Sequence, residues 1–147
     1  MKSFILAAVT VLCAITAISV EARDTRNMFP LSEALETEDA KSKLDKNIRF
    51  FFGKQNHPAI AKNFGEVMTN KKTNAFNKTD KRACEWAFLS AMLSFKDRAI
   101  RDGGNAIVNI RSFYKKNEIS SETEYECGAG GIMAGVTFKG DIVKLAK

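Results

Sequence analysis

The chain has 147 residues, 45% of them hydrophobic, and its 23 lysines and arginines against 17 acidic residues give a formal net charge of +6. A chain of this length can bury a core of its own without a metal, and beyond residue 22 no apolar stretch is long enough to span a bilayer. The positive charge favours anionic partners.

The first 22 residues have the features of a cleavable secretory signal peptide. Lys2 supplies a positive start, residues 4–20 form an uncharged apolar run, and Val20-Glu21-Ala22 places small residues at the cleavage positions. A membrane anchor is the competing interpretation, but the run is shorter than the roughly 20 residues that a spanning helix needs. We therefore expect a mature protein that starts at Arg23, forms one domain over residues 23–147, and is periplasmic or secreted.

Several short elements are expected next. Pro30 is typical of the start of a helix, Thr37 is a good cap for a second helix, and two runs rich in Phe, Ile and Val indicate strands. The expected elements are helices at 32–35 and 37–44 and strands at 48–52 and 64–68. The stretch 69–78 is rich in Asn and Lys, so we expect a polar loop there.

The longest predicted element is a helix that begins after Thr79, a good N-cap, and ends at Asp102 before Gly103. Its apolar residues lie on two opposite faces at helical spacing. One face carries Cys84, Phe88, Ala91, Phe95 and Ala99, and the other carries Trp86, Leu89, Leu93 and Ile100. Because a helix with two apolar faces needs cover on both, we expect a sheet on one side and the N-terminal helices or a partner subunit on the other.

Four strands are expected after the helix, bounded by glycines or polar turns, at 106–113, 122–127, 132–138 and 142–145. Their connections are too short to cross over, so we expect these strands to pair antiparallel. The predicted fold class is α+β, with one long helix packed on an antiparallel sheet and short N-terminal helices.

Cys84 and Cys127 are the two cysteines of the expected mature chain, and an even number in an exported protein indicates a disulfide. The alternation within 122–127 places Cys127 with Thr123 and Tyr125 on the face toward the helix, within reach of Cys84. Two free thiols are the alternative.

The opposite face of the same strand carries three glutamates, which could form a cation site or a solvated face. We favour a solvated face paired across strands, because hard cations need ligands from several segments. The residues concerned are Glu122, Glu124 and Glu126, with Arg111, Lys115 and Lys139 as expected partners.

The sequence contains no recognisable catalytic or cofactor motif. The single histidine, His57, lacks the companions of a metal site or a nucleophilic triad. Gly128-Ala129-Gly130-Gly131 lacks the strand-to-helix setting of a phosphate-binding loop and is better suited to a hairpin turn or bulge. We therefore expect no cofactor, no metal and no enzymatic activity.

Positive charge gathers around the loop before the long helix, with one aromatic residue among the cations. The residues are Lys71, Lys72, Phe76, Lys78, Lys81 and Arg82. Such a surface suits an anionic partner, which for an exported protein means an envelope component or an acidic protein rather than nucleic acid. A plain solvated loop is the alternative, because charge also promotes solubility.

Residues 103–110, Gly-Gly-Asn-Ala-Ile-Val-Asn-Ile, follow a long helix and lead into strands with glycine-rich turns. In this respect residues 82–145 resemble the YbjQ-like and RcsF-like family, in which a helix ends in a Gly-x-Asn-Ala turn that feeds a strand. The resemblance implies a small α+β unit with a role in envelope sensing or assembly, and it implies a structural disulfide at Cys127. The chain differs from RcsF in lacking a lipid-anchor site and in having two mature cysteines in place of four.

The mature chain, including residues 69–74 and Cys84-Glu85-Trp86-Ala87-Phe88, also resembles small exported bacterial proteins that are often called excinuclease ABC proteins. The DNA-repair ATPase of that name is large and cytosolic, with P-loops and cysteine-rich zinc modules. This sequence has neither, so the resemblance implies kinship with the exported group and not that activity.

Two functions stay open at this point. The first is an exported, non-catalytic binding, sensing or envelope-assembly module. The second is a small-ligand or metal carrier, or an enzyme, whose site is assembled from scattered residues. A deep polar pocket with perturbed carboxylates would favour the second, and a flat surface with basic residues would favour the first.

Overall fold

A computed structural model describes residues 23–44 and 46–147; the predicted signal peptide, residues 1–22, lies outside them. Within the described residues the chain forms six strands, three α-helices and a short 3-10 turn. In order they are β1 (Thr25–Pro30), α1 (Leu31–Glu36), α2 (Glu38–Lys43), β2 (Arg49–Phe52), β3 (Ile60–Asn74), α3 (Asp80–Asp102), β4 (Ala106–Ser112), η1 (Tyr114–Lys116), β5 (Glu124–Ala129) and β6 (Met133–Leu145).

The strand β6 is the centre of a single six-stranded sheet. One edge of β6 pairs antiparallel with β3 along its whole length. Its other edge pairs first with β5, at Gly135 and Ala134, and then with β4, from Phe138 to Val143. The sheet continues from β5 to β1 and from β4 to β2.

The sheet is mixed, whereas the sequence predicted an antiparallel one. The pair β2–β4 is parallel, with Arg49 opposite Ala106. The short connections after α3 do give the expected antiparallel pairs. Between β2 and β4, however, the chain forms β3 and α3, and this long connection supplies the crossover that a parallel pair requires.

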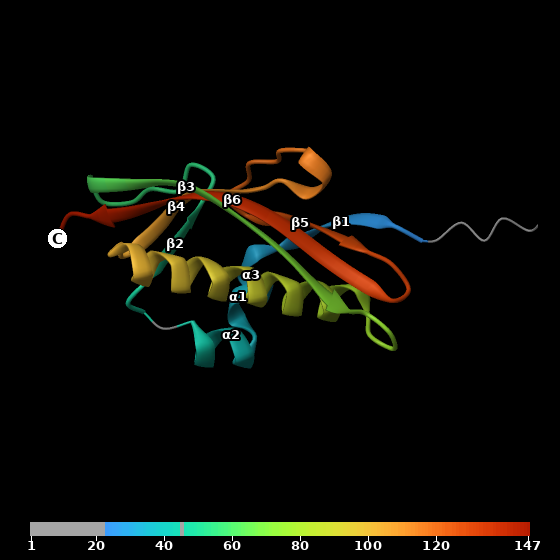
Figure 1. The fold of residues 1–147 in the computed structure, drawn as a ribbon. Helices are drawn as coiled ribbons and strands as arrows, with labels where there is room; N and C mark the ends of the chain where they lie inside the picture. Colours follow the sequence, from blue (N-terminus) through green and yellow to red (C-terminus); the bar gives the residue numbers. More distant parts are fainter. Residues whose placement is uncertain (1–22, 45) are drawn as a thin grey trace, which may run out of the picture.

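The helix α3 begins and ends where the sequence predicted. The hydroxyl of Thr79 accepts a hydrogen bond from the Arg82 N–H at 3.1 Å, and Gly103 ends the helix in the left-handed region with φ of 84°. The helix lies along one face of the sheet, while α1 and α2 lie on its far side (Figure 1). Helices and a sheet share one core, which confirms the α+β class.

The core is centred on Phe88 of α3. Its ring lies 4.7 Å from the ring of Tyr125, 5.8 Å from that of Phe138 and 6.0 Å from that of Phe52. The other residues of the first predicted apolar face are also buried: Cys84, Ala91, Phe95 and Ala99. Cys84 forms the predicted disulfide with Cys127, with Cα atoms 6.0 Å apart, and this bond ties α3 to β5.

The second apolar face of α3 is covered over only part of its length. Leu89 is buried, and both α1 and α2 contact the helix. Trp86 and Leu93 are half-buried, and Ile100 near the C-terminal end is 57% exposed. The N-terminal helices therefore cover the first half of this face and leave the second half open.

The strand β3 corrects the prediction of a short strand at 64–68 followed by a polar loop at 69–78. It runs without a break through the Asn- and Lys-rich stretch to Asn74, with β6 as its neighbour. Thr69 is buried on the side of α3, whereas Asn70 and Lys72 on the other face are exposed. Polar and lysine-rich sequence suits such an edge strand, because it discourages pairing with other chains.

Two further strand predictions were incomplete. The polar edge strand β1 was not predicted, and β6 joins two segments that were predicted as separate strands. The joint is at Gly140, where a Cβ atom would lie 2.7 Å from the Cγ2 of Ile107. Glycine at this position therefore serves the close approach of β4 and β6 and not a turn.

Candidate binding surface

The six residues predicted to bind an anionic partner are divided among three elements. Lys71 and Lys72 lie on β3, Phe76 and Lys78 in the turn that follows, and Lys81 and Arg82 in the first turn of α3. Lys71 and Lys72 separate further, because successive residues of a strand point to opposite faces. Lys71 lies opposite the buried Val136, on the side of α3, and Lys72 lies opposite Gly135, on the outer face.

Lys81 and Arg82 are held by acidic residues of the described part of the chain. The ammonium of Lys81 lies 2.5 Å from the carboxylate of Glu33. The guanidinium of Arg82 lies 3.4 Å from the carboxylate of Asp39 and 3.5 Å from that of Glu85. These two cations therefore connect α3 to the N-terminal helices.

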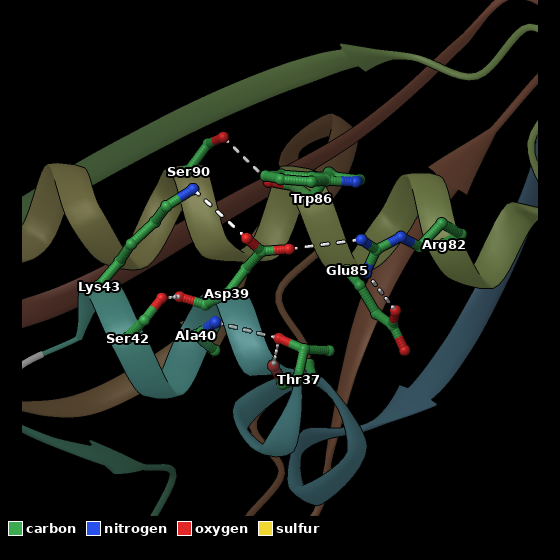
Figure 2. A network of polar contacts seen from close by, with 10 residues as sticks. Thr37, Asp39, Ala40, Ser42, Lys43, Arg82, Glu85, Trp86 and Ser90 are labelled. Carbon is green, nitrogen blue, oxygen red and sulfur yellow. Dashed lines mark hydrogen bonds and ion pairs between the residues drawn. The ribbon is translucent and has the colours of Figure 1, made fainter.

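Figure 2 shows how Trp86 takes part in the same contact. Its ring lies 5.0 Å from the guanidinium of Arg82 and 5.1 Å from the ammonium of Lys43, both within the range of cation–π attraction. Asp39 lies between the two cations, 3.6 Å from the ammonium of Lys43. This network holds α2 against α3.

The turn that contains Phe76 and Lys78 meets a second turn at one end of the molecule. The turn between β3 and α3 and the turn between β5 and β6 lie together at the end opposite the C-terminus (Figure 1), and the Ala75 N–H donates to the Ile132 carbonyl at 2.6 Å. This contact places the segment that carries Phe76 beside the segment that carries Ile132 and Met133, and the three residues are 62%, 69% and 47% exposed in that order. We call these three residues the apolar tip.

Two lysines accompany the apolar tip. Lys78 is in the same turn as Phe76, and Lys72 lines the same hollow of the outer face as Ile132 and Met133. Both lysines are exposed, and neither forms an ion pair within residues 23–44 and 46–147. The tip therefore combines exposed apolar side chains with unneutralised positive charge.

Two sets of hydrogen bonds order the turns of the tip. The side-chain carbonyl of Asn74 accepts from the Phe76 N–H at 2.7 Å. The guanidinium of Arg23 donates to both carboxylate oxygens of Asp80, at 2.7 and 2.9 Å, and to the Gly130 carbonyl at 2.9 Å. Arg23 thereby joins the start of α3 to the turn between β5 and β6, and its hydrogen bond lowers the pKa of Asp80.

An open hollow of about 600 Å³ lies behind the tip on the outer face of the sheet. Gly128 and Gly135 form part of its floor, and Tyr114 forms one wall. The phenol of Tyr114 packs directly on Gly128, where a Cβ atom would collide with the phenol oxygen. The sequence predicted Gly128 to be part of a hairpin turn or bulge, and it indicated no binding role for Ile132 and Met133, an exposed apolar pair directly after Gly130-Gly131.

Two of the three glutamates, Glu122 and Glu124, are exposed as predicted, whereas Glu126 is not. Glu126 is buried, lies 3.7 Å from Arg26, and keeps one carboxylate oxygen without a hydrogen-bond partner in the described part of the chain. Each predicted cationic partner pairs with another acid: Arg111 with Glu66 and Glu118, Lys115 with Asp24, and Lys139 with Glu66.

The segment after β4 explains this difference. It folds back over the outer face of the sheet, where the Phe113 N–H donates to the Thr137 carbonyl at 2.7 Å. The hydroxyl of Ser112 accepts from the Glu126 N–H at 2.9 Å. The outer face of the sheet near β5, which we expected to be solvated, is therefore covered by the segment that follows β4.

Three carboxyl groups have pKa values below their ordinary range: Asp24, Glu66 and Asp80. The largest cause in each case is a hydrogen bond from a cation, namely Lys115, Arg111 and Arg23 in the same order. This is the behaviour of ion-paired surface carboxylates, whereas a general acid has a raised pKa.

Within the described ranges 23–44 and 46–147, no three His, Cys, Asp or Glu side chains are grouped so that they could hold a metal ion. In the same part of the chain, no helix has both the length and the apolar character needed to cross a membrane.

Comparison of the chain with family models, curated proteins and solved structures gives no significant match. The likeness to the YbjQ-like and RcsF-like family therefore stays a prediction from residues 82–145.

Proposed function

We propose that the protein is an exported, non-catalytic binding module that attaches to the anionic lipid surface of the cell envelope through its apolar tip. The observation that carries this proposal is that two hydrogen-bonded segments expose Phe76 on one and Ile132 and Met133 on the other, beside two lysines that form no ion pair within the described residues. Soluble proteins rarely expose large apolar side chains in a cluster unless the cluster binds something. Apolar side chains enter the headgroup region of a bilayer, and lysines are attracted to anionic headgroups.

The expected strength of this attachment follows from exposure and charge. Burial of a whole Phe or Ile side chain stabilises by about 1.5–3 kcal/mol. Burial of the exposed fractions of Phe76 and Ile132 therefore contributes about 1–2 kcal/mol each. A lysine near an anionic membrane contributes about 1 kcal/mol. The contributions of the two apolar side chains and the two lysines add up to a dissociation constant between millimolar and micromolar, so the attachment is reversible.

Export is supported by two features of the chain. Residues 1–22 have the composition of a signal peptide. The disulfide between Cys84 and Cys127 belongs to the chemistry of oxidising compartments. These features support our proposal that the protein works in the periplasm or outside the cell.

Flotation of the protein with vesicles tests the proposal. Vesicles of phosphatidylglycerol and phosphatidylcholine should carry the protein upward, and pure phosphatidylcholine vesicles should carry much less. Phe76→Ala should weaken binding about tenfold at every salt concentration, because it removes apolar contact. The matched control is Ile100→Ala, which alters a similarly exposed residue far from the tip and should bind like the wild type.

The lysines should act differently from Phe76. The double variant Lys72→Ala, Lys78→Ala should flatten the dependence of binding on salt, because exposed charges are screened over about 8 Å at physiological ionic strength. Lys144→Ala, at the other end of β6, is the control. Failure of the wild type to float with anionic vesicles would refute the proposal, and capture of an acidic protein by the tip instead would assign this surface to a protein partner.

A small-ligand carrier is the second candidate, and the hollow behind the tip favours it. Its volume of about 600 Å³ suits a small molecule, and glycine and apolar side chains dominate its lining. Native mass spectrometry of the exported protein should then show a bound molecule that is absent from the variant Gly135→Trp.

A further inference from the structure

The strand β3 has a free edge beside the open flank of α3. Within the described residues β3 pairs with β6 alone, so the opposite edge of this 15-residue strand has no neighbouring strand. A groove of about 630 Å³ lies between this strand and the flank of α3. Main-chain donors and acceptors on such an edge can pair with another extended chain.

The groove is positively charged. Its lining carries four cations, Lys71, Lys72, Arg98 and Arg101, against the single carboxylate of Asp97. Arg98 is paired with Asp102 at 2.8 Å. Lys71 and Arg101 have no ion-pair partner in the part of the chain that the structure describes. An occupant with negative charge is therefore favoured.

The wall of the groove also carries apolar side chains that the side chains of a bound chain could contact. Val67 of β3 and Leu93 of α3 are half-buried in its wall, and the buried Phe95 lies beneath them. A lipid headgroup or a nucleic acid would satisfy the cations but not the main-chain groups of the strand edge. A peptide satisfies both, since its backbone has the spacing of a strand and its alternate side chains point to the groove.

A second copy of β3 is a poor occupant. Two β3 strands paired antiparallel about Lys71 and Lys72 would bring these lysines of the two copies close together, and like charges on neighbouring strands are destabilising. The charge of the groove thus disfavours this pairing and favours a chain of opposite charge.

We propose that an extended acidic segment of another protein adds as a strand to the free edge of β3, with carboxylates at Lys71 and Arg101 and an aliphatic side chain over Val67 and Leu93. This surface is separate from the apolar tip, and the proposal does not depend on attachment to lipid.

The test uses short capped peptides and the isotope-labelled protein. The probe is a peptide of alternating Val and Glu, and the controls are a peptide of alternating Val and Lys and a Val–Glu peptide with alternate amides methylated. We expect the Val–Glu peptide to shift the amide resonances of β3 between Val67 and Lys72 and those of the adjoining flank of α3. The methylated peptide should bind about tenfold more weakly, because it cannot complete a ladder of main-chain hydrogen bonds.

Variants separate this groove from the tip. Lys71→Ala and Arg101→Ala should each weaken the Val–Glu peptide about fivefold, as expected for loss of one exposed charge pair. Phe76→Ala should leave peptide binding unchanged while it impairs vesicle binding. The proposal is overturned if the resonances of β3 do not respond, if both charged peptides bind alike, or if methylation of the amides has no effect.

Discussion

Reduction of the disulfide between Cys84 and Cys127 should destabilise the protein strongly. The two cysteines are 43 residues apart in sequence, and the bond closes this loop between α3 and β5. In the chain-entropy treatment, closing a loop of this length stabilises the native state by about 4 kcal/mol. For a domain of this size a change of 1 kcal/mol shifts the melting temperature by about 4 °C, so full reduction should lower it by about 15 °C.

The assay is thermal unfolding followed by circular dichroism, with and without prior reduction in denaturant and refolding. The matched control is the double variant Cys84→Ala, Cys127→Ala, which should melt near the reduced wild type and should not respond to reductant. Protein made with residues 1–22 should start at Arg23 in mass spectrometry and contain no titratable thiol. Two free thiols in unreduced exported protein, or a shift of less than about 5 °C, would refute this reasoning.

Two further predictions concern the region around the tip. Arg23→Ala should lower the melting temperature at neutral pH, because Arg23 is paired with Asp80 and donates to the Gly130 carbonyl. The difference from the wild type should shrink as pH falls through the lowered pKa of Asp80, because a carboxyl whose pKa is depressed by folding loses its stabilising effect once it is protonated, and only the part due to Gly130 should remain. A difference that does not change with pH would contradict this account. Gly128→Ala should destabilise by about 1–3 kcal/mol, because the new methyl group collides with the phenol of Tyr114. Tyr114→Ala should relieve that collision, so a double-mutant cycle from chemical denaturation should be clearly non-additive, and additive effects would disprove the contact.

Local signals in the sequence were sufficient for the helices. Thr37 and Thr79 cap α2 and α3 as expected, and the apolar spacing around Phe88 identified the face of α3 that is buried. Alternation also placed Cys127 toward that face correctly. These predictions succeeded because caps, periodicity and cysteine pairing depend on residues within one element or on a single possible pair.

The strand β3 shows where local reasoning fails. Asn and Lys at 70–72 disfavour a strand by composition, yet β6 offers a long edge for pairing and one face of β3 remains in water. Pairing with a distant strand therefore overrode local propensity. The same error concealed the separation of Lys71 from Lys72, because residues in a loop have no fixed alternation of faces.

The apolar tip could not be assembled from the sequence. Phe76 was identified among the lysines, but Ile132 and Met133 are more than fifty positions away along the chain. They join Phe76 because β6 pairs with β3 from end to end, which brings Met133 opposite Asn74. Pairing between distant strands thus forms the apolar tip, and nothing in the local sequence around Phe76 indicates that Ile132 and Met133 lie beside it.

The arrangement of β3 lets the two proposed surfaces work at the same time. The strand runs away from the tip, from Asn74 beside it to Ile60 near the C-terminal end of the chain, and α3 runs beside it in the same region (Figure 1). A molecule held at a membrane by its tip would therefore keep the groove along its flank in water. Lys71 lines only the groove, whereas Lys72 lines both the groove and the hollow behind the tip, so this one lysine is the positive charge that the two surfaces share.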